Sequence, residues 1–185
     1  HTLDRWRFSD GGDNSTVFTM SQDTNVPTGQ GFAKSLKMDV TTADGSPGSS
    51  DSMFLQQRFE GQNLQLLKKG TSSAEKITVA FWVSSSKTGT YILELQDSDN
   101  TRNCSQSYTI SSADTWEKKV VVFPADTTGA IDNDNANSFE VNWWLLAGTD
   151  FTSGTLATSF ASRTNANRAV GQVNHADSTS NNWYI

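Results

Sequence analysis

The chain has 185 residues, a size at which one domain buries roughly 70% of the surface that its unfolded chain exposes, so that it can form a core without disulfides. Its formal net charge is −6, and its Lys and Arg residues form no cluster, which argues against nucleic acid or an anionic membrane as a partner. The single cysteine, Cys104, excludes an internal disulfide, and a Cys-based zinc site would need further ligands.

Short apolar runs alternate along the chain with Ser, Thr, Asn, Asp and Gly, a pattern typical of an all-β protein. One helical turn is expected over residues 62–68, where leucines are too crowded for alternation, and a surface loop over residues 41–52. In chain order, the predicted strands cover residues 3–8, 17–21, 35–41, 53–59, 77–84, 90–96, 107–110, 116–123, 138–146, 170–174 and 181–185.

Apolar residues recur at every second position in several of these segments, so that one face of each strand is apolar. We therefore expect an antiparallel two-sheet β-sandwich, and the loop spacing fits a jelly roll as well as an immunoglobulin-like fold. The predicted core residues are Leu36, Met38, Val40, Ile77, Val79, Phe81, Val83, Tyr91, Leu93, Leu95, Phe139, Val141, Trp143 and Leu145.

Several segments, read in order, resemble the carbohydrate-binding-module-like (galactose-binding-like) jelly roll of bacteriophage tail, fibre and other virion proteins. The resemblance implies a jelly roll and a virion or extracellular location. Because the sequence begins without Met and ends within a predicted strand, we expect residues 1–185 to be a single domain from a longer virion protein. The segments are HTLDRW at 1–6, SLKMDV at 35–40, FLQQRFE at 54–60, ITVAFWV at 77–83, TWEKKV at 115–120, GQVN at 171–174 and NWYI at 182–185.

The same alternation turns a mixture of aromatic and planar polar side chains away from the core. Aromatic rings stack on the apolar faces of sugars while amide, carboxylate and guanidinium groups bind the hydroxyls, so this mixture predicts a glycan site. The alternative is that loops, a neighbouring domain or a symmetry mate cover this face. The candidate glycan-binding residues are Trp82, Trp144, Arg58, Gln56, Glu94 and Asn142, whereas Trp6, Trp116 and Trp183 are expected to plug the ends of the sandwich.

Two acidic turns, at residues 9–14 and 132–135, offer the oxygen ligands that calcium prefers. Neither fits an EF-hand loop, and plain Asx-turns are the alternative. No cofactor is expected to be required, but the resemblance implies that a structural calcium is compatible with such a module. The candidate metal ligands are Asp10, Asp13, Asp132 and Asp134.

The sequence contains little that points to catalysis. It has no nucleophile elbow and no phosphate-binding glycine loop, and Cys104 and His175 are interpreted as structural residues. Glu94 and Glu140 are the best carboxylate pair for glycoside hydrolysis if their strands are neighbours.

The sequence is compatible with three functions. The sequence favours a non-catalytic module that binds host or environmental glycans, with avidity from many copies on a virion. The second is a structural virion component, such as a capsid decoration, cement or fibre segment, that binds neighbouring virion proteins or forms a homo-oligomer such as a trimer. The third is a polysaccharide-active enzyme.

Overall fold

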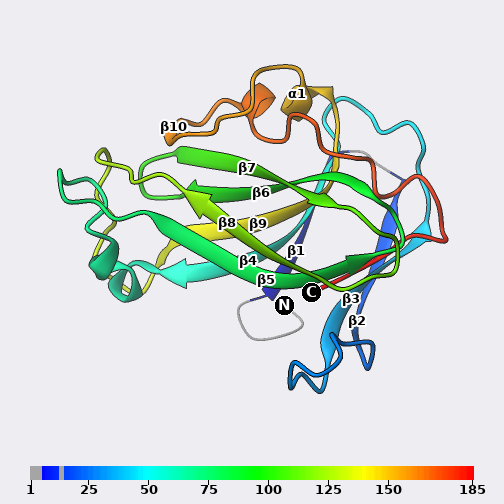
Figure 1. Ribbon diagram of the computed structural model, residues 1–185. Helices are drawn as coiled ribbons and strands as arrows, with labels where there is room; N and C mark the ends of the chain where they lie inside the picture. The colour runs from blue at the N-terminus through cyan, green and yellow to red at the C-terminus, as the bar shows by residue number, and fades with distance from the viewer. Residues whose placement is uncertain (1–5, 13–14) are drawn as a thin grey trace.

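The computed structural model describes residues 6–12 and 15–185, which form two antiparallel sheets packed face to face (Figure 1). The predicted all-β sandwich is confirmed, and the chain crosses repeatedly between the sheets, as in a jelly roll. Sheet A has the order β1-β4-β9-β6-β7-β10 and consists of β1 (Trp6–Gly11), β4 (Ser52–Glu60), β9 (Asn137–Ala147), β6 (Gly89–Asp97), β7 (Arg102–Ile110) and β10 (Ala161–Ser162). Sheet B has the order β2-β3-β11-β5-β8 and consists of β2 (Val17–Asp23), β3 (Ser35–Thr42), β11 (Asn182–Tyr184), β5 (Ile77–Ser85) and β8 (Glu117–Phe123).

The core lies between the two sheets and follows the predicted alternation. In β5, Phe81 and Val83 are buried whereas Thr78 and Ala80 are exposed, because successive side chains of a strand point to opposite faces. Every predicted core residue belongs to the main cluster or packs against it. Period two was therefore a sufficient guide to which side chains of these strands point into the core between the sheets.

Short helical turns connect some of the strands. The helical turn expected over residues 62–68 is present as two 3-10 turns, η1 (Gly61–Asn63) and η2 (Gln65–Leu67). Two further turns, α1 (Thr149–Thr152) and η3 (Asn165–Asn167), lie in the long segment between β9 and β11. No helix among the described residues is long and apolar enough to cross a membrane.

The strand predicted over residues 170–174 is wrong. Gly171 has a φ of 89°, a left-handed conformation that interrupts an extended chain. Isolated hydrogen bonds replace a ladder there: the Val173 amide donates to the Thr90 carbonyl at 2.9 Å, and the His175 amide to the Leu145 carbonyl at 2.9 Å. Residues 170–174 thus belong to a loop that is fastened to two strands by these hydrogen bonds.

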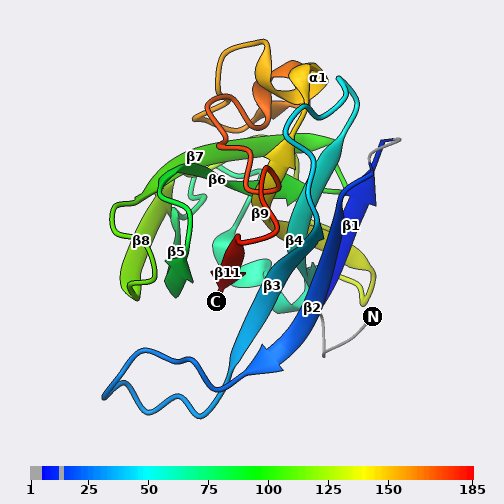
Figure 2. The same cartoon turned by 90° about the vertical axis from the view of Figure 1, so that its right-hand side faces the viewer.

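Residues 148–173, which include the short edge strand β10, cover the face of sheet A that points away from sheet B, at the top of Figure 2. A second, smaller apolar cluster forms beneath this cover, where Phe151 and Leu156 pack against strand residues. The strand and loop residues buried in it are Phe54, Ile92, Trp144 and Ala169. Residues 148–173 are called the covering segment below.

The covering segment begins at Gly148, which has no room for a side chain. A Cβ atom there would lie 2.1 Å from the Gly48 carbonyl oxygen and 2.5 Å from that of Ser49. We expect Gly148→Ala to lower the free energy of unfolding by roughly 2 kcal/mol, because the backbone must shift to relieve the overlap. Urea denaturation measures the loss, and Gly45→Ala is the control, since nothing lies within 4 Å of a Cβ at Gly45. Equal stability of the two variants would contradict the close packing of this junction.

Candidate functional site: a buried polar network and an open groove

Five of the six predicted glycan-binding residues lie together on the outer face of sheet A, where strands β4, β9 and β6 are neighbours. Gln56 links the first part of this group: its Nε2 donates to Glu140 Oε2 at 2.9 Å and to Asn142 Oδ1 at 3.0 Å. Arg58 donates from Nε to Gln56 Oε1 at 2.7 Å and pairs with Glu140 at 3.2 Å. The alternation therefore placed these side chains on one face, as predicted.

Glu94 is the centre of the second part of the network. Its carboxylate accepts hydrogen bonds from Asn142 Nδ2 at 3.2 Å and from the Trp144 indole at 3.1 Å. Arg168, from the covering segment, donates to both of its oxygens, at 2.7 and 2.9 Å. Burial lowers the pKa of Arg168, but the charge and hydrogen bonds of Glu94 outweigh it and raise that pKa above its usual value. The role of Arg168 could not be predicted from the sequence, because the segment around it has no hydrophobic periodicity.

This network is closed to solvent over most of its extent. Trp144, Glu94 and Asn142 are fully buried, and Gln56 is 3% exposed. Arg58, with 35% of its side chain exposed, is the open end of the network. The expectation of an open aromatic face on sheet A is therefore corrected, because the covering segment occupies that face, as in the alternative interpretation.

Trp82, the sixth predicted residue, lies on the other sheet. It points outward from β5 in sheet B, opposite Lys118 of β8, and is half-buried. Sequence alternation identified it as outward-facing but could not show that β5 and β9 belong to different sheets. The structure therefore separates Trp82 from Trp144.

The remaining reactive groups are engaged in the interior. Burial raises the pKa of the Cys104 thiol to about 12, so that it stays protonated and unreactive near neutral pH. Glu94 is bound to Arg168 and Glu140 to Arg58, in the contacts given above. His175 is fully buried, and its Nδ1 lies 2.9 Å from the Tyr91 hydroxyl.

The candidate metal ligands come from the two acidic turns, of which the first is described only in part. Asp10 lies on β1 opposite Met53, and Asp13 is outside the described residues. Asp132 and Asp134 are exposed in the loop before β9, where Asp134 Oδ1 accepts the Ala136 amide at 3.0 Å in an Asx-turn. Within the described part of the chain, no three His, Cys, Asp or Glu side chains are grouped to hold a metal ion.

An open groove lies in sheet B beside the short strand β11. Figure 2 shows β11 between β3 and β5, where Trp183 pairs with Met38 on one side and with Ser85 on the other. Ile185 still exchanges backbone hydrogen bonds with Leu36, at 2.9 and 3.1 Å. Beyond Ile185, in the direction of β11, the space next to β5 is a groove of about 580 Å³.

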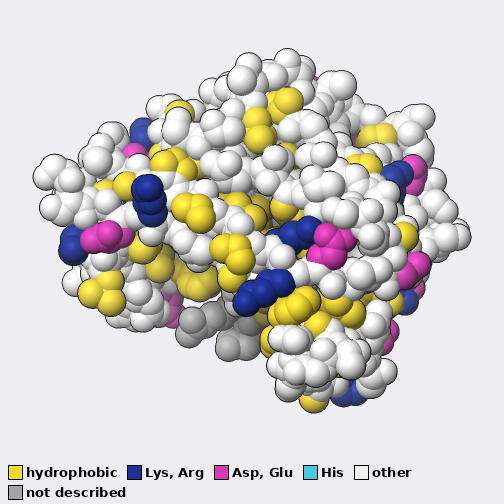
Figure 3. All heavy atoms as spheres, viewed as in Figure 1, with side chains coloured by type: hydrophobic (Ala, Val, Ile, Leu, Met, Phe, Trp, Pro, Cys, Tyr) yellow, Lys and Arg dark blue, Asp and Glu magenta, His cyan; other side chains and the backbone are white. Residues whose placement is uncertain are grey.

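The groove reaches through sheet B to the core. Figure 3 shows a hollow on this face with hydrophobic side chains at its bottom and Lys or Arg side chains on its rim. Its lining includes two lysines, Lys34 and Lys118, but no described Asp or Glu, although the whole chain has a net charge of −6. The lining residues are Trp6, Pro27, Phe32, Lys34, Ser35, Gln57, Val79, Ala80, Phe81, Trp82, Trp116, Lys118, Trp143 and Ile185.

The backbone edge of β5 forms one wall of the groove. On its other side β5 pairs with β8 along Ile77–Val83, from Ile77 opposite Phe123 to Val83 opposite Glu117. Toward the groove, β5 is paired with β11 through Ser84 and Ser85, and over residues 77–83 no described residue pairs with that edge. Every second residue of this stretch therefore directs its N–H and C=O into the groove.

Comparisons with known proteins give no close relative. No family model and no curated protein sequence matches the chain. Among solved structures, the chain is similar to the enzymatically active domain of tailspike protein 4 of bacteriophage CBA120, with 16% identity, a TM-score of 0.49, and coverage of 98% of this chain and 18% of the other. It is also similar to the Clostridium thermocellum xylanase 10B CBM22-1-GH10 modules, with 13% identity, a TM-score of 0.39, and coverage of 76% of this chain and 25% of the other. Both likenesses are too remote to transfer a ligand, an activity or a site.

Proposed function

We propose that the domain is a non-catalytic interaction module of a virion protein, and that its groove holds an extended strand of the virion polypeptide that adjoins it. One observation carries this proposal: the edge of β5 over residues 77–83, with which no described residue pairs, continues the line of β11. Free strand edges are templates for another strand, and binding modules use them in this way. The virion setting is supported by the resemblance of the strand segments to phage virion modules.

The neighbouring residues indicate the chemistry of the occupant. Trp183 and Ile185 point toward the core, whereas Tyr184 points outward, 6.1 Å from the Trp116 ring centre. A strand that continues this alternation has every second side chain over the apolar floor formed by Phe81 and Trp143. Its other side chains point outward, beside the lysines of the rim. We therefore expect apolar residues at the inward positions and acidic residues at the outward ones.

The expected affinity comes from ladder bonds and buried apolar surface together. Each new backbone hydrogen bond contributes about 1 kcal/mol net. Burial of apolar area contributes about 25 cal/mol per Å², less the entropy of ordering the strand. A strand attached to the domain is present at an effective concentration in the millimolar range, so that even weak pairing is measurable.

An appended strand tests this proposal. We expect six residues added directly after Ile185, with Val at the second, fourth and sixth positions and Thr or Glu at the others, to raise the free energy of unfolding by about 3 kcal/mol. For a domain of this size the midpoint of thermal unfolding should rise by roughly 10 °C. Calorimetry and urea denaturation measure both quantities.

The control extension has the same composition shifted by one position. A shift of one residue turns every Val outward and every Glu toward the floor, so this extension should leave stability unchanged or lower it. If both extensions have the same effect, or neither raises stability, the groove does not accept a strand.

A glycan in the groove is the second candidate function. It is favoured by Trp82 and Trp116, which line the groove and are half-buried, since partly exposed indoles are suited to stacking on sugars. A glycan array with a multivalent form of the domain distinguishes the two occupants. Glycan binding that both Trp116→Ala and the matched strand extension abolish would favour the sugar as the occupant. If the array shows no glycan binding, the strand is favoured.

A further inference from the structure

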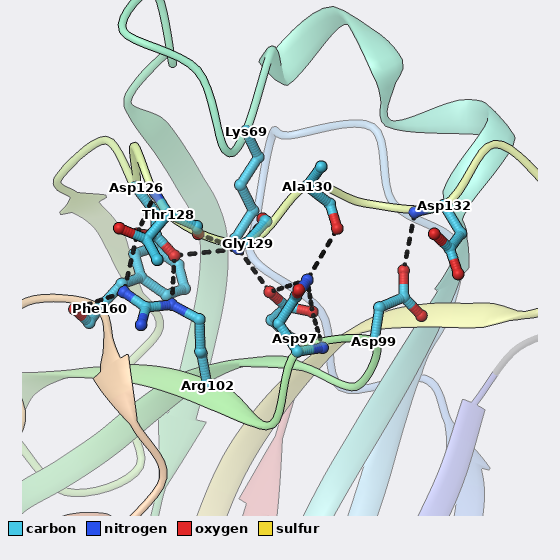
Figure 4. Close-up of polar contacts among 11 residues, drawn as sticks. Lys69, Asp97, Asp99, Arg102, Asp126, Thr128, Gly129, Ala130, Asp132 and Phe160 are labelled. Atoms are coloured by element: carbon cyan, nitrogen blue, oxygen red, sulfur yellow. Dashed lines mark hydrogen bonds and ion pairs between the residues drawn. The ribbon is translucent and has the colours of Figure 1, made fainter.

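Lys69 directs its charged side chain into one end of the sandwich, where it meets oxygen atoms from two other parts of the chain. It follows η2, and its ammonium reaches the β6–β7 turn and the segment between β8 and β9 (Figure 4). Its side chain is 3% exposed, and that of Asp97 is fully buried. Isolated buried ammonium groups are rare because removal from water costs several kcal/mol, so this one requires close partners.

Four oxygen atoms form a cage around the Lys69 ammonium. It pairs with the Asp97 carboxylate and with Asp126 Oδ2, the latter at 2.9 Å. It also donates to the backbone carbonyls of Gly129 and Thr128, at 2.8 and 3.2 Å. Two carboxylates and two carbonyls are the type of oxygen donor set that proteins use to bind calcium.

Other residues hold the two carboxylates in place independently of Lys69. Asn100 donates from its backbone amide and its side chain to Asp97, at 3.0 to 3.2 Å, and from Nδ2 to the Ala130 carbonyl at 2.8 Å. Arg102 donates to both oxygens of Asp126 at 2.9 Å. Although burial opposes it, hydrogen bonds from Arg102 and Lys69 lower the pKa of Asp126, which keeps this carboxyl ionised. The cage should therefore persist when the ammonium is removed.

We infer that this cage is a cation site that the chain fills with its own Lys69 ammonium, and that shortening Lys69 converts it into a calcium site. The evidence is a cation already held by four oxygens, of which the Asp97 and Asp126 carboxylates are also fixed by Asn100 and Arg102, rather than the acidic residues alone. The ammonium joins the end of β6 to the segment between β8 and β9, as a bound metal ion would. This inference is independent of the groove, which lies elsewhere and has other lining residues.

Three proteins test the inference: the unchanged domain, Lys69→Ala and Lys69→Met. Thermal unfolding is followed with EDTA, with 10 mM CaCl2, and with NaCl at matched ionic strength. Lys69→Ala vacates the cage, whereas Lys69→Met removes the charge but keeps most of the side-chain volume. For a site with a Kd of about 1 mM, 10 mM calcium should increase the folding equilibrium constant of Lys69→Ala about tenfold.

We expect both variants to unfold at lower temperature than the unchanged domain, and calcium to raise the midpoint of Lys69→Ala alone. Adding Asp97→Asn to Lys69→Ala should abolish the calcium response, because it removes a charged ligand. The inference is overturned if calcium affects Lys69→Ala no more than Lys69→Met, if the added Asp97→Asn leaves the response intact, or if Lys69→Ala stays unfolded even with calcium.

Discussion

Replacing Arg168 by Met should lower the free energy of unfolding by about 4 kcal/mol, because it leaves the Glu94 carboxylate buried without its cation. Arg168 is 8% exposed, binds Glu94 through two hydrogen bonds, and lies over Trp144 with 5.0 Å from its guanidinium carbon to the ring centre. It is the buried ion pair that attaches the covering segment to sheet A, beside backbone hydrogen bonds such as that from the Ser105 amide to the Ala157 carbonyl. Urea denaturation followed by tryptophan fluorescence measures the loss.

The double variant Arg168→Met/Glu94→Gln separates charge from packing. A glutamine at that position carries no charge, and its side-chain oxygen can still accept from Trp144 and Asn142, so we expect it to recover more than half of the loss. Arg163→Met, in the same segment but without a described ion pair, should change stability by less than about 0.5 kcal/mol. A loss below about 1 kcal/mol for Arg168→Met would show that the pair does not fasten the covering segment.

Acidification should destabilise the domain strongly through His175. The pKa of this imidazole falls from 6.5 to about 3, mainly because it is buried and also because of the nearby Lys87 charge, while Asp177 acts in the opposite direction. Its Nδ1 faces the Tyr91 hydroxyl, and its Nε2 is buried without a partner among the described residues, so an added proton would find no acceptor.

The direction of the pH effect follows from proton binding by His175 in the folded and unfolded states. Between pH 6.5 and about 3 the unfolded chain binds the proton and the folded one does not, so the free energy of unfolding decreases as the pH falls through this range. The pKa difference corresponds to roughly 4 kcal/mol at the acid end. Carboxyls with lowered pKa values, such as Asp126, add to acid lability below pH 4 in the same direction.

His175→Gln isolates this contribution, because glutamine keeps a polar group opposite Tyr91 but does not titrate. Urea denaturation from pH 7 to pH 4 should show a much flatter dependence for the variant than for the unchanged domain. Parallel curves for the two proteins would show that His175 is not the source of acid lability.

The sequence was informative wherever a structural feature depends on local alternation. Phe81 and Val83 point into the core and Trp82 points out, because a strand reverses its side chains at every residue. Alternation also directed Trp144 away from the core correctly. Whether such a residue is exposed depends on what packs over it. Over Trp144 lies the covering segment, whose Arg168 binds Glu94 at a separation of 74 residues in the sequence.

The groove could not be predicted because it arises from strand pairing, not from any one segment. It exists because β11 fills part of the space between β3 and β5, and its lining comes from both sheets and from the loop before β3. The Lys69 cage could not be predicted either, since two of its oxygens are backbone carbonyls, which every residue has. The sequence also could not show which oxygens of the predicted ligands are engaged: Asp134 accepts the Ala136 amide within its exposed turn.

Amide hydrogen exchange along β5 tests the proposed strand acceptor most directly. In the domain alone, alternate amides of residues 77–83 face the groove and should exchange quickly, while those bound to β8 exchange slowly. With the matched extension after Ile185, the groove-facing amides should become protected about 100-fold or more, corresponding to about 3 kcal/mol. Unchanged exchange at these amides, or equal protection by the shifted extension, would contradict the proposal.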